Sequence, residues 1–154
     1  MMQRWTLGLC FCIVGLAIPT PAQAALNCTV STVGVAFGAY DVFSSSPLAS
    51  TGSVTVRCTG AQPGLNPISV SLSSGNSGSF QPRKLFRGFE TLDYNLYLDP
   101  GNTQIWGNGT GGTLRYTSVS SNRPITLTIF GRIPPGQDIS AGIYSDTIVV
   151  TVDF

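Results

Sequence analysis

The sequence lacks histidine and has few charged residues. None of its 154 residues is histidine, and Asp, Glu, Lys and Arg together make up 10% of the chain. Without histidine there can be no Ser-His-Asp or Cys-His arrangement, and the commonest general base and metal ligand is missing. So few basic residues build no strong positive potential, which disfavours nucleic acid and anionic lipid as partners. We therefore expect no enzyme, no cofactor, no metal site and no nucleic-acid function.

Long hydrophobic runs are also scarce. The one extended run, residues 5–18, follows Arg4 and precedes a polar stretch that closes with Ala22-Gln23-Ala24. Its length of about 14 residues is below the roughly 20 that a membrane-spanning helix needs. A basic start, a short apolar centre and a small-residue end are typical of a secretory signal peptide. We expect residues 1–24 to be cleaved, no membrane span to remain, and residues 25–154 to form one exported domain.

Cleavage after Ala24 changes both the charge and the cysteine count. Removing Arg4 from the eight basic residues leaves seven against seven acidic residues, so the mature net charge is zero. Cys28 and Cys58 become the two remaining cysteines, in an oxidising compartment. We expect them to form a disulfide, which would stabilise the fold by about 3–4 kcal/mol in the chain-entropy view.

Helical periodicity is largely absent, and apolar residues alternate instead between turns rich in Gly, Ser, Asn and Pro. This pattern predicts about seven β-strands in two packed antiparallel sheets. The Ser/Gly-rich segment 73–79 is expected to be a mobile surface connection. The strands are expected at Val33–Phe37, Val54–Cys58, Ile68–Leu72, Leu92–Leu98 with a hairpin into 103–106, Thr113–Ser118, Ile125–Ile129 and Ile143–Phe154.

Four groups of residues could carry chemistry, and for each a structural role is preferred. They could serve glycoside hydrolysis, calcium binding, sugar stacking and partner binding. We prefer solvated charges, because the carboxylates would splay to different sides, and turn residues, because the run lacks the order of a calcium loop. For the other two groups we prefer core aromatics and a solvated strand face, the commoner roles of such residues. The groups are Glu90 with Asp93; Asp99 with Asn102 and Asn108; Trp106 with Tyr94, Tyr97 and Tyr116; and Arg83 with Lys84 and Arg87.

Seven short motifs occur in an order that resembles the spore coat protein U domain family, whose members include pilins of archaic chaperone-usher pili. The likeness covers residues 28–154. The motifs are Cys28-Thr29-Val30, Phe37-Gly38-Ala39-Tyr40, Val54-Thr55-Val56-Arg57-Cys58, Leu92-Asp93-Tyr94-Asn95-Leu96-Tyr97, Ile105-Trp106-Gly107, Phe130-Gly131-Arg132 and Ala141-Gly142-Ile143-Tyr144 with the residues that follow to Val152.

This resemblance implies an incomplete immunoglobulin-like sandwich that is completed by a donated strand. The implied partners are a periplasmic chaperone, an outer-membrane usher and other pilus subunits, with passage through the periplasm to the cell surface or a pilus. Strand donation adds an extended segment to an open sheet edge. The expected acceptor groove lies along one face of the last strand, at Ile148, Val150, Val152 and Phe154.

The predicted extension before Cys28 departs from the pattern of a polymerising pilin. After cleavage, Ala25, Leu26 and Asn27 precede Cys28, and a strand commonly needs about 5–6 residues. The chain is therefore expected to accept a strand but hardly to donate one, which suits a terminal or tip subunit with a possible surface ligand. The alternative is a free-standing secreted carbohydrate-binding β-sandwich or a coat protein.

Overall fold

The computed structural model describes residues 26–60, 67–119 and 123–154, so the predicted signal peptide lies outside the described residues. Within these ranges the chain is all-β, as predicted, and no helix is long and apolar enough to cross a membrane. The elements are β1 (Asn27–Val33), β2 (Leu48–Thr59), β3 (Pro67–Leu72), the 3-10 turn η1 (Gly75–Ser77), β4 (Arg83–Arg87), β5 (Glu90–Tyr97), β6 (Tyr116–Val119), β7 (Ile125–Ile133) and β8 (Val150–Asp153).

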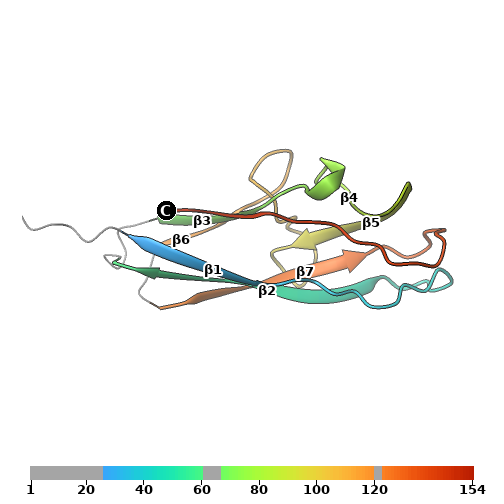
Figure 1. Ribbon diagram of the computed structural model, residues 1–154, viewed down its shortest axis with the longest axis horizontal. Coiled ribbons are helices and arrows are strands. Elements are labelled where there is room, and N and C mark those ends of the chain that lie inside the picture. Colours follow the sequence, from blue (N-terminus) through green and yellow to red (C-terminus); the bar gives the residue numbers. More distant parts are fainter. Residues whose placement is uncertain (1–25, 61–66, 120–122) are drawn as a thin grey trace, which may run out of the picture.

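The strands form two layers, which confirms the predicted two-sheet architecture (Figure 1). One sheet has the order β1-β2-β7-β5-β4 and the other has the order β6-β3-β8. The larger sheet curls, because β5 pairs with β4 over Glu90–Tyr94 and with β7 over Asn95–Tyr97. The β4–β5 hairpin therefore continues toward the layer that contains β3.

The period-two alternation produces the core. Val54, Val56 and Cys58 on β2 are at most 2% exposed. On β3, Ile68 and Val70 face them from the other layer and are equally buried. Burying a large aliphatic side chain stabilises a fold by roughly 1.5–3 kcal/mol, so this alternation fixes which face of each strand points inward.

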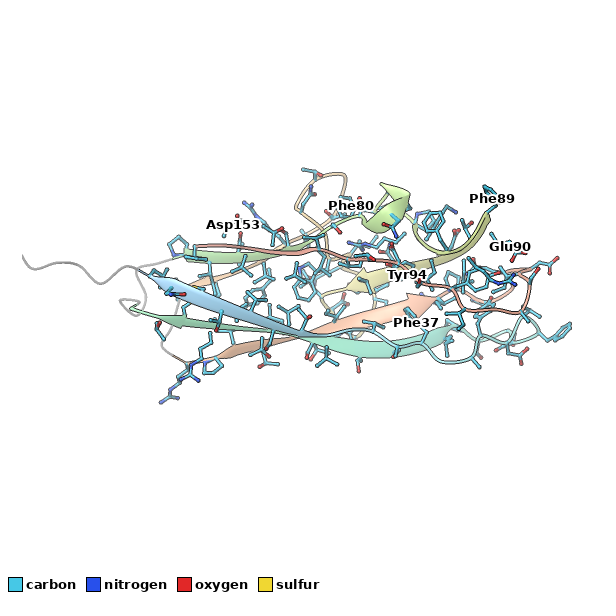
Figure 2. All side chains as sticks on the ribbon, viewed as in Figure 1. Phe37, Phe80, Phe89, Glu90, Tyr94 and Asp153 are labelled. Carbon is cyan, nitrogen blue, oxygen red and sulfur yellow. A yellow bond between two sulfur atoms is a disulfide. The ribbon has the colours of Figure 1, made fainter. Side chains whose placement is uncertain are left out.

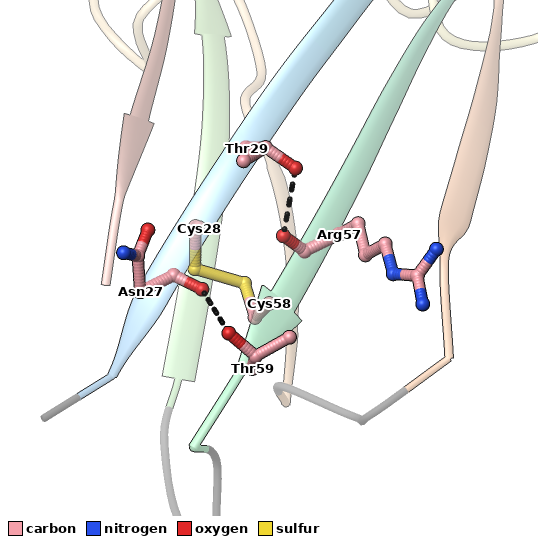
Figure 3. Close-up of a disulfide and its surroundings, with 6 residues drawn as sticks. All are labelled: Asn27, Cys28, Thr29, Arg57, Cys58 and Thr59. Carbon is pink, nitrogen blue, oxygen red and sulfur yellow. Dashed lines mark hydrogen bonds between the residues drawn. A yellow bond between two sulfur atoms is a disulfide. The ribbon is translucent and has the colours of Figure 1, made fainter. Parts of the chain in front are cut away.

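The disulfide forms as predicted and joins β1 to β2 (Figure 3). Cys28 lies directly opposite Cys58 in the ladder, with 4.0 Å between their Cα atoms. Thr29 Oγ1 donates a hydrogen bond to Arg57 O at 3.3 Å. Among the described residues β1 has β2 as its one ladder partner, so the disulfide fastens an edge strand.

The first strand was predicted too late in the sequence, because β1 ends at Val33. Residues 34–37 leave the ladder and cross the inner face of the sheet. A Cβ atom on Gly131 would lie 2.6 Å from Val35 Cγ1 and 2.8 Å from Phe37 Cζ, so the missing side chain of Gly131 makes room for this crossing. The alternation of Val35 and Phe37 therefore reflects packing rather than pairing.

The last strand was predicted too long, because β8 spans only Val150–Asp153. Before it, residues 140–149 touch their neighbours at separate points: Ser73 N donates to Val149 O at 2.9 Å, and Phe86 exchanges two backbone hydrogen bonds with Ser145. β3 and β4 thus lie one after the other along the same edge of the C-terminal segment. The turn between them interrupts the ladder, which is why the segment is not one continuous strand.

The segment 73–79, predicted to be mobile, is held by a buried arginine. Arg83 is 0% exposed, so placing it on a solvated strand face was wrong. Its guanidinium donates to Ser73 O at 3.0 and 2.8 Å, to Asn95 Oδ1 at 2.8 Å and to Trp106 O at 2.7 Å. Burial lowers the pKa of Arg83 to about 10. Every polar contact serves to join loops to the core.

Trp106 closes one side of the sandwich and is a core residue, as preferred. Its side chain is 0% exposed and its Nε1 donates to Val70 O on β3 at 3.0 Å. Its backbone N donates to Leu96 O on β5 at 2.9 Å. The connection that contains Trp106 therefore ties the two layers together along this side.

Candidate functional site

The side of the sandwich formed by β1 is open. Val30 lies opposite Val56 in the ladder and therefore shares its inward face. Val56 is 1% exposed, whereas Val30 is 45% exposed. Side chains that point to the same interior should be buried alike if both are covered, so nothing within the described chain covers the inner face of β1.

The edge of the other sheet shows the same feature. Val150 and Val152 on β8 lie opposite Leu72 and Val70 on β3. The two β3 residues are 1% and 0% exposed, whereas the two β8 residues are only half-buried. Both layers therefore end in an edge strand whose apolar inner face is covered only in part.

Two adjoining cavities run between these edges. One, of about 210 Å³, is lined by the end of β1, residues 34–37 and residues Asp146, Ile148 and Val150 of the C-terminal segment. The other, of about 690 Å³, lies between residues 35–43 and 139–146. Because both are lined by Val35, Phe37, Leu85 and Asp146, we treat them as one feature and call it the open groove.

The floor of the open groove is rigidly built. The rings of Phe37 and Tyr94 meet edge to face, with centroids 5.9 Å apart (Figure 2). Tyr94 OH donates to Asp146 Oδ2 at 2.7 Å, and Asn76 N donates to Asp146 Oδ1 at 2.8 Å. Burial, followed by the hydrogen bond to Asp146, raises the pKa of Tyr94 above its ordinary range. The neutral phenol thus holds the C-terminal wall against the floor.

Of the four residues predicted for an acceptor groove, two line the open groove and two do not. Ile148 and Val150 line the open groove, and Val152 packs against the core beyond its lining. Phe154 lies past the end of β8, is 58% exposed and is not among the lining residues.

Sequence analysis missed the opposite wall and the floor of the groove. The wall is formed by Val33, Val35 and Phe37, and the floor includes Leu85 and Tyr94. The alternating apolar residues 33, 35 and 37 were the available signal, but they were interpreted as a strand facing a covered core.

The other candidate groups do not assemble a chemical site. Asp93 Oδ1 lies 2.5 Å from Lys84 Nζ, and the Glu90 carboxylate is bound elsewhere, by Arg87. Tyr94 and Trp106 are buried, so they offer no sugar-stacking platform. The oxygens of Asp99, Asn102 and Asn108 fall in turns, where Asp99 accepts hydrogen bonds from Thr103 and Gln104.

A second surface lies at the end of the molecule away from Asn27 and Phe154. Three large apolar side chains protrude from three loops there: Phe43 is 94% exposed, Phe89 is 106% exposed and Ile143 is 89% exposed. Figure 2 shows Phe89 projecting from the tip of the β4–β5 hairpin. We call Phe43, Phe89 and Ile143 the apolar loop tips.

Comparisons with known proteins identify relatives. The family model of the Spore Coat Protein U domain matches residues 16–151. Protein U of Myxococcus xanthus is 31% identical over 127 residues, covering 77% of this chain and 70% of Protein U.

A solved structure shows a similar fold. It is the complex of CsuC and CsuE, a chaperone-tip adhesion subunit pre-assembly complex from archaic chaperone-usher Csu pili of Acinetobacter baumannii. One of its chains matches with a TM-score of 0.58 and 24% identity, over 84% of this chain and 40% of that chain. This chain therefore spans less than half the length of the matching one.

Proposed function

Because the chain belongs to the spore coat protein U domain family, we propose that it is a subunit of a chaperone-usher pilus that receives a donated strand in the open groove. The observation that carries the proposal is the pair of inner faces that are covered only in part. Val30 and Val150 belong to edge strands in different sheets, and the end of β1 lines the open groove together with Val150. An extended segment with apolar residues at alternate positions would cover both.

The partners follow from this mode of completion. A periplasmic chaperone would fill the open groove first, and a strand from another subunit would replace it at an outer-membrane usher. The similar fold in a chaperone-subunit complex supports a chaperone as the first partner. Export through the periplasm also suits the disulfide, because such bonds persist in oxidising compartments.

Two neighbouring valines provide a matched test of the groove. Val150 lines the open groove, whereas Val149 is 59% exposed and is not among its lining residues. The exported chain should be mixed with a peptide carrying the N-terminal extension of a companion subunit, and the melting temperature recorded. We expect the peptide to raise the melting temperature of the wild type and of Val149→Arg, but not of Val150→Arg. Equal stabilisation of the two variants would contradict the proposal, as would a wild type that gains nothing.

The apolar loop tips favour a second role, adhesion, at a terminal position in the pilus. Large exposed apolar patches mark sites of interaction, and here three loops at one end of the molecule each expose a large apolar side chain. Phe43 and Ile143 border the larger cavity of the open groove with side chains that are almost fully exposed, whereas Phe89 lies outside its lining. The three side chains together offer an extended apolar surface instead of an enclosed pocket for a small ligand. Burying one such side chain on contact would contribute roughly 1.5–3 kcal/mol.

Adhesion can be tested with beads that carry octyl chains. We expect Phe89→Ser and Ile143→Ser each to weaken retention of the exported chain by about 10- to 100-fold, given that burial energy. Leu114→Ser is the matched control, because Leu114 is also exposed, at 47%, but is not one of the apolar loop tips. If all three variants were retained like the wild type, the adhesive role would be wrong and the strand-accepting role would be unaffected.

A further inference from the structure

Residues on both sides of Phe89 contact residues on both sides of Ile143. Arg87 and Glu90 flank the hairpin tip that carries Phe89, while Gly142 and Tyr144 flank Ile143. Figure 2 shows Glu90 just below Phe89, at the base of the hairpin tip. Phe89 and Ile143, the two exposed apolar residues of these loops, thus each lie between residues that contact the other loop.

The Glu90 carboxylate makes most of these contacts. Its Oε2 accepts from Arg87 Nη1 and from the Tyr144 hydroxyl, each at 2.8 Å, and its Oε1 accepts from Ser140 Oγ at 2.5 Å. These hydrogen bonds lower the pKa of Glu90, with those from Ser140 and Tyr144 contributing most. One ionised side chain therefore binds the hairpin to the 140–144 loop.

Gly142 adds a steric contact to the polar ones. A Cβ atom at this position would lie 2.0 Å from Arg87 Nε, so the Arg87 side chain rests on the bare backbone of Gly142. Below the tips, Phe86 and Ser145 exchange backbone hydrogen bonds of 2.8 and 3.1 Å. The two loops are therefore joined at their base by backbone and near their tips by side chains.

Phe43 stands outside this arrangement. Its loop is stabilised locally, by Asp41 Oδ1 accepting from Phe43 N at 2.9 Å and by Ser44 N donating to Asp41 O at 3.1 Å. The contacts of Glu90 thus pair two of the three apolar loop tips and leave the third independent.

We propose that Glu90 is a positioning residue that holds Phe89 and Ile143 as one preformed contact surface, a proposal that rests on the adhesive role. Fixing the loops before contact removes part of the ordering cost of binding. Losing Glu90 should therefore weaken adhesion without removing any side chain that touches the surface. Ordering costs of about 0.5–1.5 kcal/mol per side chain correspond to a loss of about 2- to 10-fold.

The test combines adhesion with loop dynamics. In Glu90→Ala we expect octyl-bead retention to fall about 2- to 10-fold at an unchanged melting temperature. The backbone order parameters of residues 141–144, measured by NMR relaxation, should fall from about 0.85 toward 0.6. Asp93→Ala is the matched control, because it breaks the other ion pair of this hairpin and should change neither quantity. Gly142→Ala should act like Glu90→Ala by displacing Arg87.

Combined variants distinguish a failure of the positioning role from a failure of the adhesive role. The effect of Glu90→Ala should shrink in a Phe89→Ser background and persist in a Phe43→Ser background, since Glu90 positions Phe89 and Ile143 but not Phe43. If Phe89→Ser weakens adhesion while Glu90→Ala leaves retention and order parameters unchanged, the positioning role is overturned and adhesion stands. If Phe89→Ser has no effect, the adhesive role itself fails.

Discussion

Arg83 shows how much one buried side chain can organise. Its guanidinium satisfies carbonyl groups of two loops and the amide of Asn95, without a carboxylate in hydrogen-bond contact. Buried polar groups left without partners cost about 1–3 kcal/mol each. We therefore expect Arg83→Met to lower the free energy of unfolding by about 3–5 kcal/mol, measured by urea denaturation. Arg57→Met, at an exposed strand position, is the control and should change stability by less than about 0.5 kcal/mol.

Tyr94 predicts how stability depends on alkaline pH. Its pKa is raised in the folded protein from an ordinary value of 10.0, first by burial and then by the hydrogen bond to Asp146. The folded state therefore holds this proton more tightly than the unfolded state, so the contribution is complete below about pH 10 and is lost as the pH rises further. Unfolding measured between about pH 9 and 11 should show a shallower decline in Tyr94→Phe than in the wild type. Parallel declines would contradict this assignment.

At the scale of elements, Gly131 decides where the segment after β1 can go. Its missing side chain admits Val35 and Phe37, which form one wall of the open groove. A methyl group here would push this wall outward. We expect Gly131→Ala to lower stability by about 1–3 kcal/mol, as overpacking does, and to weaken binding of a donor peptide in calorimetric titration. Gly136→Ala is the control: its positive φ of 75° makes an alanine there costly for stability, but no atom lies near its Cβ position, so peptide binding should be unchanged.

The strands that pair with another strand on each side could be predicted from the sequence. In β2, β3 and β5 a covered inner face makes apolar residues alternate along the sequence, so Val54, Ile68 and Leu92 were correctly placed in the core. The two edge segments were placed less well. Residues 33–37 and 143–149 alternate like strands because they face the groove, yet few ladder bonds hold them. The alternation of apolar residues indicates which side chains face inward. Where a strand begins and ends depends on the neighbouring strands that pair with it, and these are known only from the fold.

The apolar loop tips and the buried arginine could not be predicted for a related reason. A single Phe or Ile in a turn-rich segment carries no periodic signal, and its exposure depends on which loops share an end of the molecule. Arg83 alternates with Leu85 on β4, so its inward direction was readable, but its partners come from segments up to 23 residues away.

For the whole molecule, the open groove and the neutral charge act together. An open apolar groove together with the net charge of zero predicted for the mature chain would give little repulsion between copies. We expect the isolated exported chain to self-associate at micromolar concentration near neutral pH, as seen by sedimentation velocity. A bound donor peptide should return it to a monomer, because the peptide covers the inner faces of both edge strands. Persistent association in the filled state would place the contact elsewhere, for example at the apolar loop tips.

The strands run along the long axis of the molecule, with the start of β1 at one end and the tip of the β4–β5 hairpin at the other (Figure 1). A subunit gripped through a strand in its groove and attached through its tips would be pulled along that axis. Tension parallel to a ladder loads all its hydrogen bonds at once, whereas tension across a ladder opens them one by one. If the open groove receives a donated strand as proposed, the edge that is open in the isolated chain would carry this load, and the Cys28–Cys58 bond would hold β1 to β2 beside it.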